Sequence, residues 1–200
     1  MPRRPERARS VRCSRFTLVA AALVCLAGAV QAQSAERLAL CAACHGAKGI
    51  SASPQIPSLA AQPKIFVENQ LVLIREGLRD VPHMKGMLDG VPDTELSALA
   101  SHFQAQPAPG PAAGPVQADR FQRGKDLARS ALCGTCHLPD YSGRQQIPRL
   151  AGQHEVFLLD TMKQFRDHAG LGRDTVMSAS LLGINDAQLA DLAHYFANFR

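Results

Sequence analysis

The hydrophobic positions of this chain recur with the spacing of α-helices. Residues 184–199 read "INDAQLADLAHYFANF", and their apolar side chains fall on one helical face, comprising Leu189, Leu192, Ala193 and Phe196. Asn185 precedes this face and is a suitable N-cap. No segment shows the period-two alternation of a half-buried β-strand. The pattern therefore predicts an all-α fold.

Helical spacing marks four further segments. The apolar face of the last helix recurs earlier in the chain as Leu96, Leu99, Ala100 and Phe103, with Pro92 suited to the first turn. Two middle helices are expected, one beginning near Gln62 and Pro63 and carrying Phe66, Gln70 and Ile74, the other carrying Phe157, Met162 and Phe165. Residues 120–137 form another expected helical stretch, with Phe121, Leu127, Ala131 and Leu132 near helical spacing.

These recurrences belong to a duplication of the chain. "CAACHG" at 41–46 recurs as "CGTCHL" at 133–138, and "IPSLAAQ" at 56–62 recurs as "IPRLAGQ" at 147–153. Between the copies, residues 107–117 contain four prolines and no charged residue, a composition typical of a semi-rigid linker. The sequence thus predicts two domains, residues 33–106 and 118–200, joined by that Pro-rich linker.

The N-terminal region has the composition of a secretory signal peptide. Six arginines lie within residues 1–15, and the apolar run "FTLVAAALVCLAGAV" follows them. Val30-Gln31-Ala32 fits a small-x-small cleavage site, so residues 1–32 are the predicted signal peptide, with an uncleaved anchor as the alternative. The mature protein is accordingly expected in the periplasm, and a loose association with the membrane is compatible with this interpretation.

Removing the signal peptide changes the interpretation of charge. The whole chain has 22 Lys and Arg against 17 Asp and Glu, and residues 1–32 hold six Arg and one Glu. The mature chain keeps 16 basic and 16 acidic residues. Because nucleic-acid binding requires a basic surface on the folded domain, this balance argues against a nucleic-acid partner.

Four cysteines remain after cleavage: Cys41, Cys44, Cys133 and Cys136. A thioredoxin-like redox pair requires a βαβ setting, which is missing here. A zinc site requires four ligands around a tetrahedron, and neither half offers a second ligand cluster. A disulfide within Cys-x-x-Cys is strained and leaves the following histidine unexplained.

A covalently attached haem accounts for every residue of the motif. The two thiols bond the vinyl groups of the porphyrin, and the histidine that follows binds the iron. The sequence therefore predicts two haem c groups, with His45 and His137 as iron ligands and the four cysteines as covalent links. Haem would also supply core material to domains that have no Trp and only two Tyr.

The second axial ligand decides what each iron can do. A methionine closes the site, raises the potential and suits electron transfer. Met84 and Met177 align across the repeat in segments expected to be loops, so both are predicted iron ligands, with His83 or Met87 as alternatives in the first half. His154 and His194 have no equivalents, and His194 is expected to be partly exposed.

These motifs resemble those of the two-haem cytochrome c4 family over essentially the whole mature chain. The resemblance implies two tandem class I cytochrome c domains, each a few short helices around a haem. It also implies that the carbonyls of Pro57 and Pro148 accept the imidazole N–H groups of the haem ligands. Arg79 and Arg173 are candidates to face the haem propionates, with solvated surface positions as the alternative. Leu138 replaces the usual glycine after the second histidine, so the two haems are expected to differ.

The expected function is one-electron transfer between redox proteins, from a donor towards a terminal oxidase, without enzymatic activity of the chain itself. One alternative is a cytochrome subunit of a dehydrogenase, for example one that oxidises sulfur compounds. The other is a small dihaem peroxidase, which would require an iron without a strong sixth ligand.

Overall fold

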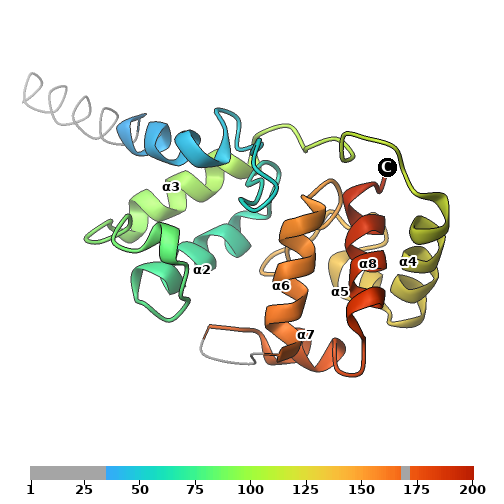
Figure 1. Ribbon diagram of the computed structural model, residues 1–200. Helices are drawn as coiled ribbons and strands as arrows, with labels where there is room; N and C mark the ends of the chain where they lie inside the picture. The colour runs from blue at the N-terminus through green and yellow to red at the C-terminus, as the bar shows by residue number, and fades with distance from the viewer. Residues whose placement is uncertain (1–34, 168–171) are drawn as a thin grey trace, which may run out of the picture. The chain divides into compact units, whose positions relative to one another are not determined.

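The computed structural model describes residues 35–167 and 172–200, and the predicted signal peptide lies outside these ranges. Arg37–Arg200 form one compact unit. Within the described ranges the regular secondary structure is helical, apart from an isolated bridge between Arg144 and Ile147 (Figure 1). The expectation of an all-α fold is confirmed. None of the described helices combines the length and apolar character that a membrane span requires.

The first half contains a helical stretch at 35–45, α2 (Lys64–Arg75), a 3₁₀ turn η1 (Pro82–Met84) and α3 (Asp93–Gln104). Helices α2 and α3 pack against each other (Figure 1). Leu96, Leu99, Ala100 and Phe103 of α3 are buried, which confirms the predicted apolar face, and the first three belong to the core shared with α2. Val67 and Leu71 of α2 complete this core.

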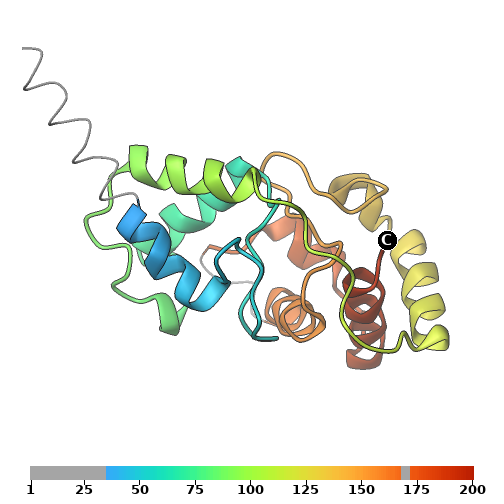
Figure 2. The same cartoon turned by 90° about the horizontal axis from the view of Figure 1, so that it is seen from above.

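The second half contains α4 (Ala118–Ser130), α5 (Cys133–His137), α6 (Glu155–Asp167), α7 (Thr175–Ser180) and α8 (Asp186–Ala197). Helices α4 and α6 both pack against α8, and Figure 2 shows α6 and α8 side by side. Asn185 caps α8 as predicted, and the structure shows that Gln188 completes a capping box with it. Helix α8 is buried over most of its length, so it forms the centre of this half.

A close approach of α4 to α8 depends on Gly124. A Cβ atom at this position would lie 2.2 Å from the carbonyl oxygen of Asp191 and 2.7 Å from Cβ of Tyr195. Glycine therefore allows the two helices to approach more closely than any other residue would. Tyr195 then stacks edge-to-face on Phe121 of α4, with 5.0 Å between the ring centroids.

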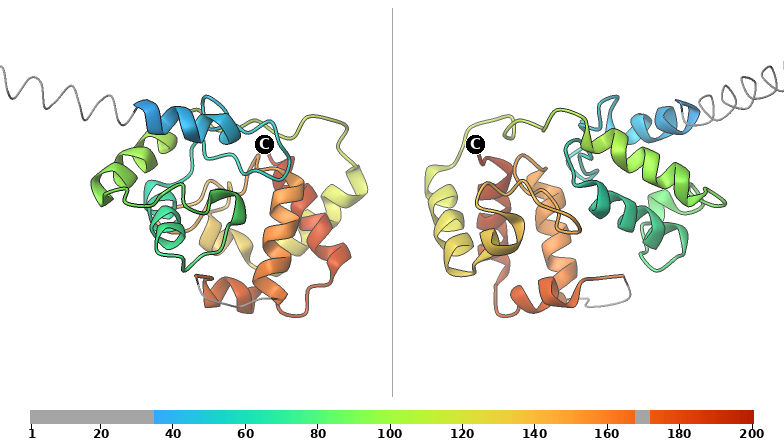
Figure 3. Two further views of the ribbon diagram at one scale, coloured as in Figure 1. Left: turned by 60° about the vertical axis from the view of Figure 1, so that its left-hand side comes forward. Right: turned by 180° about the vertical axis from the view of Figure 1, so that it is seen from behind.

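The expectation of helical spacing over 120–137 is wrong at its centre. Helix α4 ends at Ser130, and Leu132 adopts a left-handed backbone conformation with φ of 57°. This turn separates α4 from α5, which packs next to the end of α4 (Figure 3). Leu132 is 69% exposed instead of contributing to the core. The loop assignment of Met177 is also wrong, because Met177 lies in α7, whose N-cap Asp174 accepts a hydrogen bond from its backbone N–H.

The Pro-rich segment 107–117 contains no helix and is hydrogen-bonded to the second half. The backbone N–H of Ala112 donates to the carbonyl of Ala197 over 2.8 Å. At its C-terminal end, the N–H of Gln117 donates to Nε2 of His194 over 3.1 Å. Two contacts thus attach the segment to α8, although the domain boundaries drawn from the sequence remain predictions.

Candidate haem-binding sites

The two motif histidines have the same environment. Nδ1 of His45 lies 2.8 Å from the carbonyl oxygen of Pro57, and Nδ1 of His137 lies 2.8 Å from the carbonyl oxygen of Pro148. A carbonyl can only accept, so each Nδ1 carries the proton and donates it. In a neutral imidazole this leaves the lone pair on Nε2, the nitrogen that is available to a metal.

Burial favours the neutral form of these histidines. His45 is 8% exposed and His137 is 6% exposed. Burial lowers the pKa of both imidazoles, and the hydrogen bond to the proline carbonyl opposes this shift only in part. Each histidine therefore offers a neutral, oriented nitrogen ligand, which is the state that binds iron.

Cys41, Cys44, Cys133 and Cys136 form no disulfide, so their sulfur atoms are available for covalent links to haem. Cys41 and Cys133 are half-buried, whereas Cys44 and Cys136 are exposed. Burial raises the pKa of the Cys41 and Cys133 thiols, so they are not stabilised as reactive thiolates. Two unpaired thiols on one helical segment, followed by an imidazole with a free Nε2, form the donor set that fits covalent haem c.

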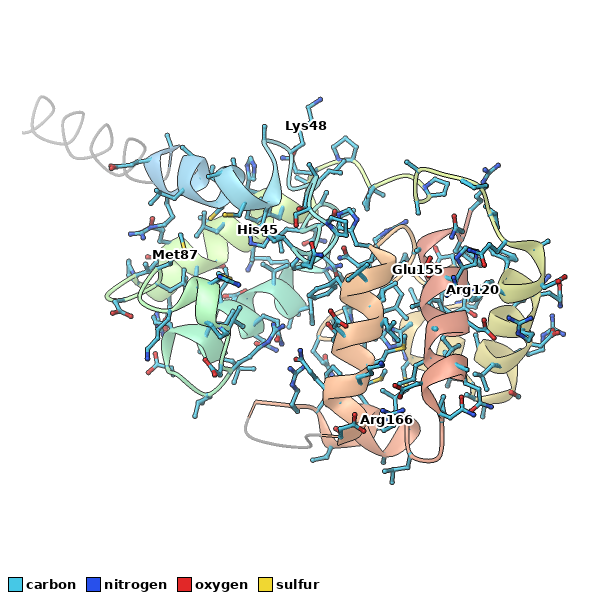
Figure 4. All side chains as sticks on the ribbon, viewed as in Figure 1. His45, Lys48, Met87, Arg120, Glu155 and Arg166 are labelled. Carbon is cyan, nitrogen blue, oxygen red and sulfur yellow. The ribbon has the colours of Figure 1, made fainter. Side chains whose placement is uncertain are left out.

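The methionines differ in their surroundings. Met84 in η1 packs against the core of the first half, and Met177 in α7 packs against the core of the second half. His83 and Met87 are exposed. Figure 4 labels Met87 together with His45. Met162 is buried in α6, in agreement with its expected role in packing.

Arg79 and Arg173 are each partly buried and bound to a glutamine. Nη1 of Arg79 donates to Oε1 of Gln70 over 2.6 Å, and Arg173 donates to Gln164. Burial, assisted by the positive charge of Arg173, lowers the pKa of Arg79 to about 10. Two half-buried guanidinium groups that repel each other form a favourable environment for anionic groups.

In each half, an arginine binds the far end of the segment that contains the candidate methionine ligand, Met84 or Met177. The sequence analysis did not predict this repeated contact. Nη1 of Arg75 donates to the carbonyl of Val91 over 2.6 Å, and the same guanidinium pairs with Asp93 at 2.8 Å. In the second half, Arg166 makes the same two contacts, at 3.0 Å to the carbonyl of Ile184 and 2.7 Å to Asp186. The signal was available, because both arginines and both aspartates recur in the duplicated segments.

The structure corrects the expected exposure of His194. This side chain is 3% exposed, and its Nδ1 lies 2.7 Å from Oε2 of Glu155. Since Nε2 accepts the N–H of Gln117, the proton lies on Nδ1 and is donated to Glu155. Arg120 pairs with the other carboxylate oxygen at 2.8 Å (Figure 4). The network joins α4, α6 and α8 with the end of the Pro-rich segment, so its role is structural.

Comparison with known proteins shows which family this chain is similar to. Residues 121–199 match the cytochrome c family. The all-helical fold and its two Cys-x-x-Cys-His sites define a dihaem c-type cytochrome. Cytochrome c4 of Azotobacter vinelandii is 32% identical over 80% of this chain and 84% of that protein. The chain belongs to the cytochrome c4 family and carries two covalently attached haem c groups.

Two further relatives extend the comparison. The crystal structure of reduced recombinant cytochrome c4 from Pseudomonas stutzeri superposes with a TM-score of 0.76 at 26% identity, covering 84% of this chain and 97% of that chain. A thiosulfate dehydrogenase electron acceptor of Stutzerimonas stutzeri strain A1501 is 30% identical over 79% of this chain and 78% of that protein.

Proposed function

We propose that this chain is an exported electron carrier that passes single electrons between respiratory redox proteins in the periplasm, towards a terminal oxidase. The observation that carries this proposal is the duplicated histidine geometry. In each half, Nδ1 of a buried histidine donates over 2.8 Å to a proline carbonyl, and two cysteines that form no disulfide precede that histidine. When bound, each haem iron can take up one electron and release it again.

The side chains of the motif have separate roles in this proposal. Cys41 and Cys44 anchor the first haem, and Cys133 and Cys136 anchor the second. His45 and His137 bind the irons through Nε2. The carbonyls of Pro57 and Pro148 hold these rings in one tautomer and raise their basicity. The arrangement orients the iron ligands before any electron arrives, which keeps the structural change on electron transfer small.

Met84 and Met177 are the proposed sixth ligands. Both pack partly buried against the core of their own half, whereas His83 and Met87 are exposed. A thioether is a soft ligand that favours reduced iron. Arg79 and Arg173 offer positive charge for the haem propionates. These placements support two closed, electron-transferring sites.

A spectroscopic redox titration of Met84→Ala and Met177→Ala tests the ligands. Each variant should lose the methionine-to-iron signature of one haem and lower the potential of that haem, while the other haem keeps its values. Met87→Ala is the matched control and should leave both haems unchanged. If Met84→Ala changes neither haem, or if Met87→Ala removes the signature, the ligand assignment in the first half fails.

A second candidate function has its own support. Similarity to a thiosulfate dehydrogenase electron acceptor favours a role as the cytochrome partner of a sulfur-compound dehydrogenase. Stopped-flow mixing separates the two functions. The oxidised protein would be reduced rapidly by such a dehydrogenase with thiosulfate, and a carrier that serves the oxidase would, when reduced, be oxidised rapidly by oxidase-containing membranes.

Peroxidase activity and export have separate tests. A dihaem peroxidase would show a high-spin haem in the oxidised spectrum, whereas two His/Met sites give low-spin spectra only.

Mass spectrometry of the periplasmic protein should find Gln33 at the N-terminus with two haems attached. A protein retained in the membrane with residues 1–32 intact would contradict cleavage.

A further inference from the structure

Two equivalent glutamines connect the halves of the protein. Gln62 ends the "IPSLAAQ" segment of the first half, and Gln153 ends the "IPRLAGQ" segment of the second. Gln62 is 5% exposed and Gln153 is 4% exposed. Burial of an uncharged amide is costly unless its donors and acceptor are paired, so the contacts of these side chains are informative.

Each glutamine binds the backbone of the opposite half with both ends of its amide. Oε1 of Gln153 accepts the N–H of Ser58 over 2.9 Å, and its Nε2 donates to the carbonyl of Ser58 over 2.9 Å. Gln62 makes the reciprocal pair with Arg149, at 2.9 Å from the backbone N–H and 3.0 Å to the carbonyl. The four bonds form one two-fold-related clasp between the halves.

The clasp ends on the peptide groups that orient the haem ligands. The N–H of Ser58 and the carbonyl of Pro57 belong to one peptide unit, and that carbonyl accepts the proton of His45. A continuous path therefore runs from Nδ1 of His45 through one planar peptide to Oε1 of Gln153. The equivalent path runs from His137 through the Pro148–Arg149 peptide to Gln62.

We propose that Gln153 is a positioning residue for the iron ligand His45, and that Gln62 is one for His137. A peptide whose N–H donates to an amide oxygen has a more negative carbonyl oxygen, because hydrogen bonds in a chain polarise one another. The carbonyl then accepts the imidazole proton more strongly and makes the ring a more basic ligand. A more basic ligand stabilises oxidised iron and lowers the reduction potential.

The consequence is that each half sets part of the potential of the haem in the other half. Docking of the halves completes both hydrogen-bond paths at once, and separation would interrupt both. This inference rests on the proposed ligation of iron by His45 and His137. The spectrum of the wild-type protein checks this ligation separately. If the wild-type spectrum lacks the His/Met signature, the proposed function itself is refuted.

The test uses Gln153→Met and Gln62→Met in the full dihaem protein. Methionine is unbranched like glutamine, but its thioether is only a weak acceptor for the N–H and has no proton to donate to the carbonyl. Potentials of the individual haems are followed by NMR, with the haem signals assigned from Met84→Ala and Met177→Ala. Gln153→Met should raise the potential of the first haem, and Gln62→Met that of the second. At a fixed potential the oxidised-to-reduced ratio should fall about twofold, or about 18 mV for one electron.

A matched control separates this effect from a general loosening between the halves. Nε2 of His154 donates to the carbonyl of Ser51 over 2.9 Å, a bond across the halves that does not end on either proline peptide. His154→Leu removes that bond and should leave both potentials close to their wild-type values. A Gln153→Met variant that shifts its own haem, both haems equally, or neither haem would overturn the inference, as would a His154→Leu variant that reproduces the crossed shift.

A measurement on the unaltered protein covers the case in which the variants do not fold. A through-hydrogen-bond coupling should connect the amide nitrogen of Ser58 with the side-chain carbonyl carbon of Gln153, and another should connect Arg149 with Gln62. The backbone amides of Ser58 and Arg149 should also exchange slowly with solvent. Absence of both couplings, or rapid exchange of these amides, refutes the proposed path whatever the variants do.

Discussion

Replacing Gly124 by alanine tests whether the contact between α4 and α8 requires a residue without a side chain. In an exposed helix this substitution stabilises by about 1 kcal/mol, because alanine has the higher helix propensity. Here the new Cβ would lie 2.2 Å from the carbonyl oxygen of Asp191, where real Cβ atoms keep more than 3.0 Å. The helices would have to separate, and overpacking of this kind costs about 1–3 kcal/mol or more. Because 2.2 Å is far inside the 3.0 Å limit, the cost lies at the upper end of this range, about 3 kcal/mol, and the expected net loss is about 2 kcal/mol.

Gly134 provides the matched control. It is also helical, but a Cβ there would meet its nearest neighbour at 3.6 Å, and the equivalent residue of the first half is Ala42. Gly134→Ala should be neutral or slightly stabilising. Guanidinium unfolding of the haem-loaded protein, followed by helical circular dichroism and haem absorbance, measures both changes. Equal stability of Gly124→Ala and wild type, or equal losses in the two variants, would refute the reasoning.

Two further predictions concern charged side chains. Arg123 donates to Asp191 over 2.7 Å and holds the pKa of that carboxyl below its usual value. A carboxyl whose pKa is lower in the folded state stabilises the protein above its unfolded pKa of about 4 and loses this effect as the pH falls through the lowered folded pKa. Asp191→Asn should therefore be less stable than wild type at pH 7, and the difference should shrink as the pH falls below about 4. A constant difference across the unfolding series would contradict this. Arg166→Gln removes the contacts of Arg166 with Ile184 and Asp186, which close the segment of Met177, so exogenous imidazole should bind the second haem several-fold faster. Arg75→Gln should have the same effect on the first haem. Unchanged binding rates would refute this role of the two arginines.

Helical content and apolar faces could be predicted because they depend on local spacing. The α8 face built on Leu189, Leu192 and Phe196 is buried as its periodicity requires, and Asn185 caps the helix. The turn before α5 could not be predicted in this way. Leu132 is a good helix former, yet it takes a left-handed conformation and leaves the core. Tertiary structure overrides local propensity at this position.

The haem motifs could be identified because their residues lie close together in the chain. The contacts of the motif histidines with Pro57 and Pro148, which the resemblance to the cytochrome c4 family implied, are present at 2.8 Å. Contacts across large sequence separations could not be derived from spacing. His194 was expected to be partly exposed, but Glu155 lies 39 residues away in the chain and pairs with it inside the core. A single sequence carries no periodicity that connects such a pair.

The clasp between the halves also shows how a duplicated chain can hold two unequal haems. Pro63 follows Gln62, and proline has no backbone N–H to offer, whereas His154 follows Gln153 and donates its N–H to Oε1 of Gln153 over 3.0 Å. The amide oxygen of Gln153 is therefore shared between two donors, and that of Gln62 accepts the N–H of Arg149. An oxygen shared between two donors polarises each of them less. The path to His45 is thus the weaker one, so Gln62→Met should shift the second haem more than Gln153→Met shifts the first.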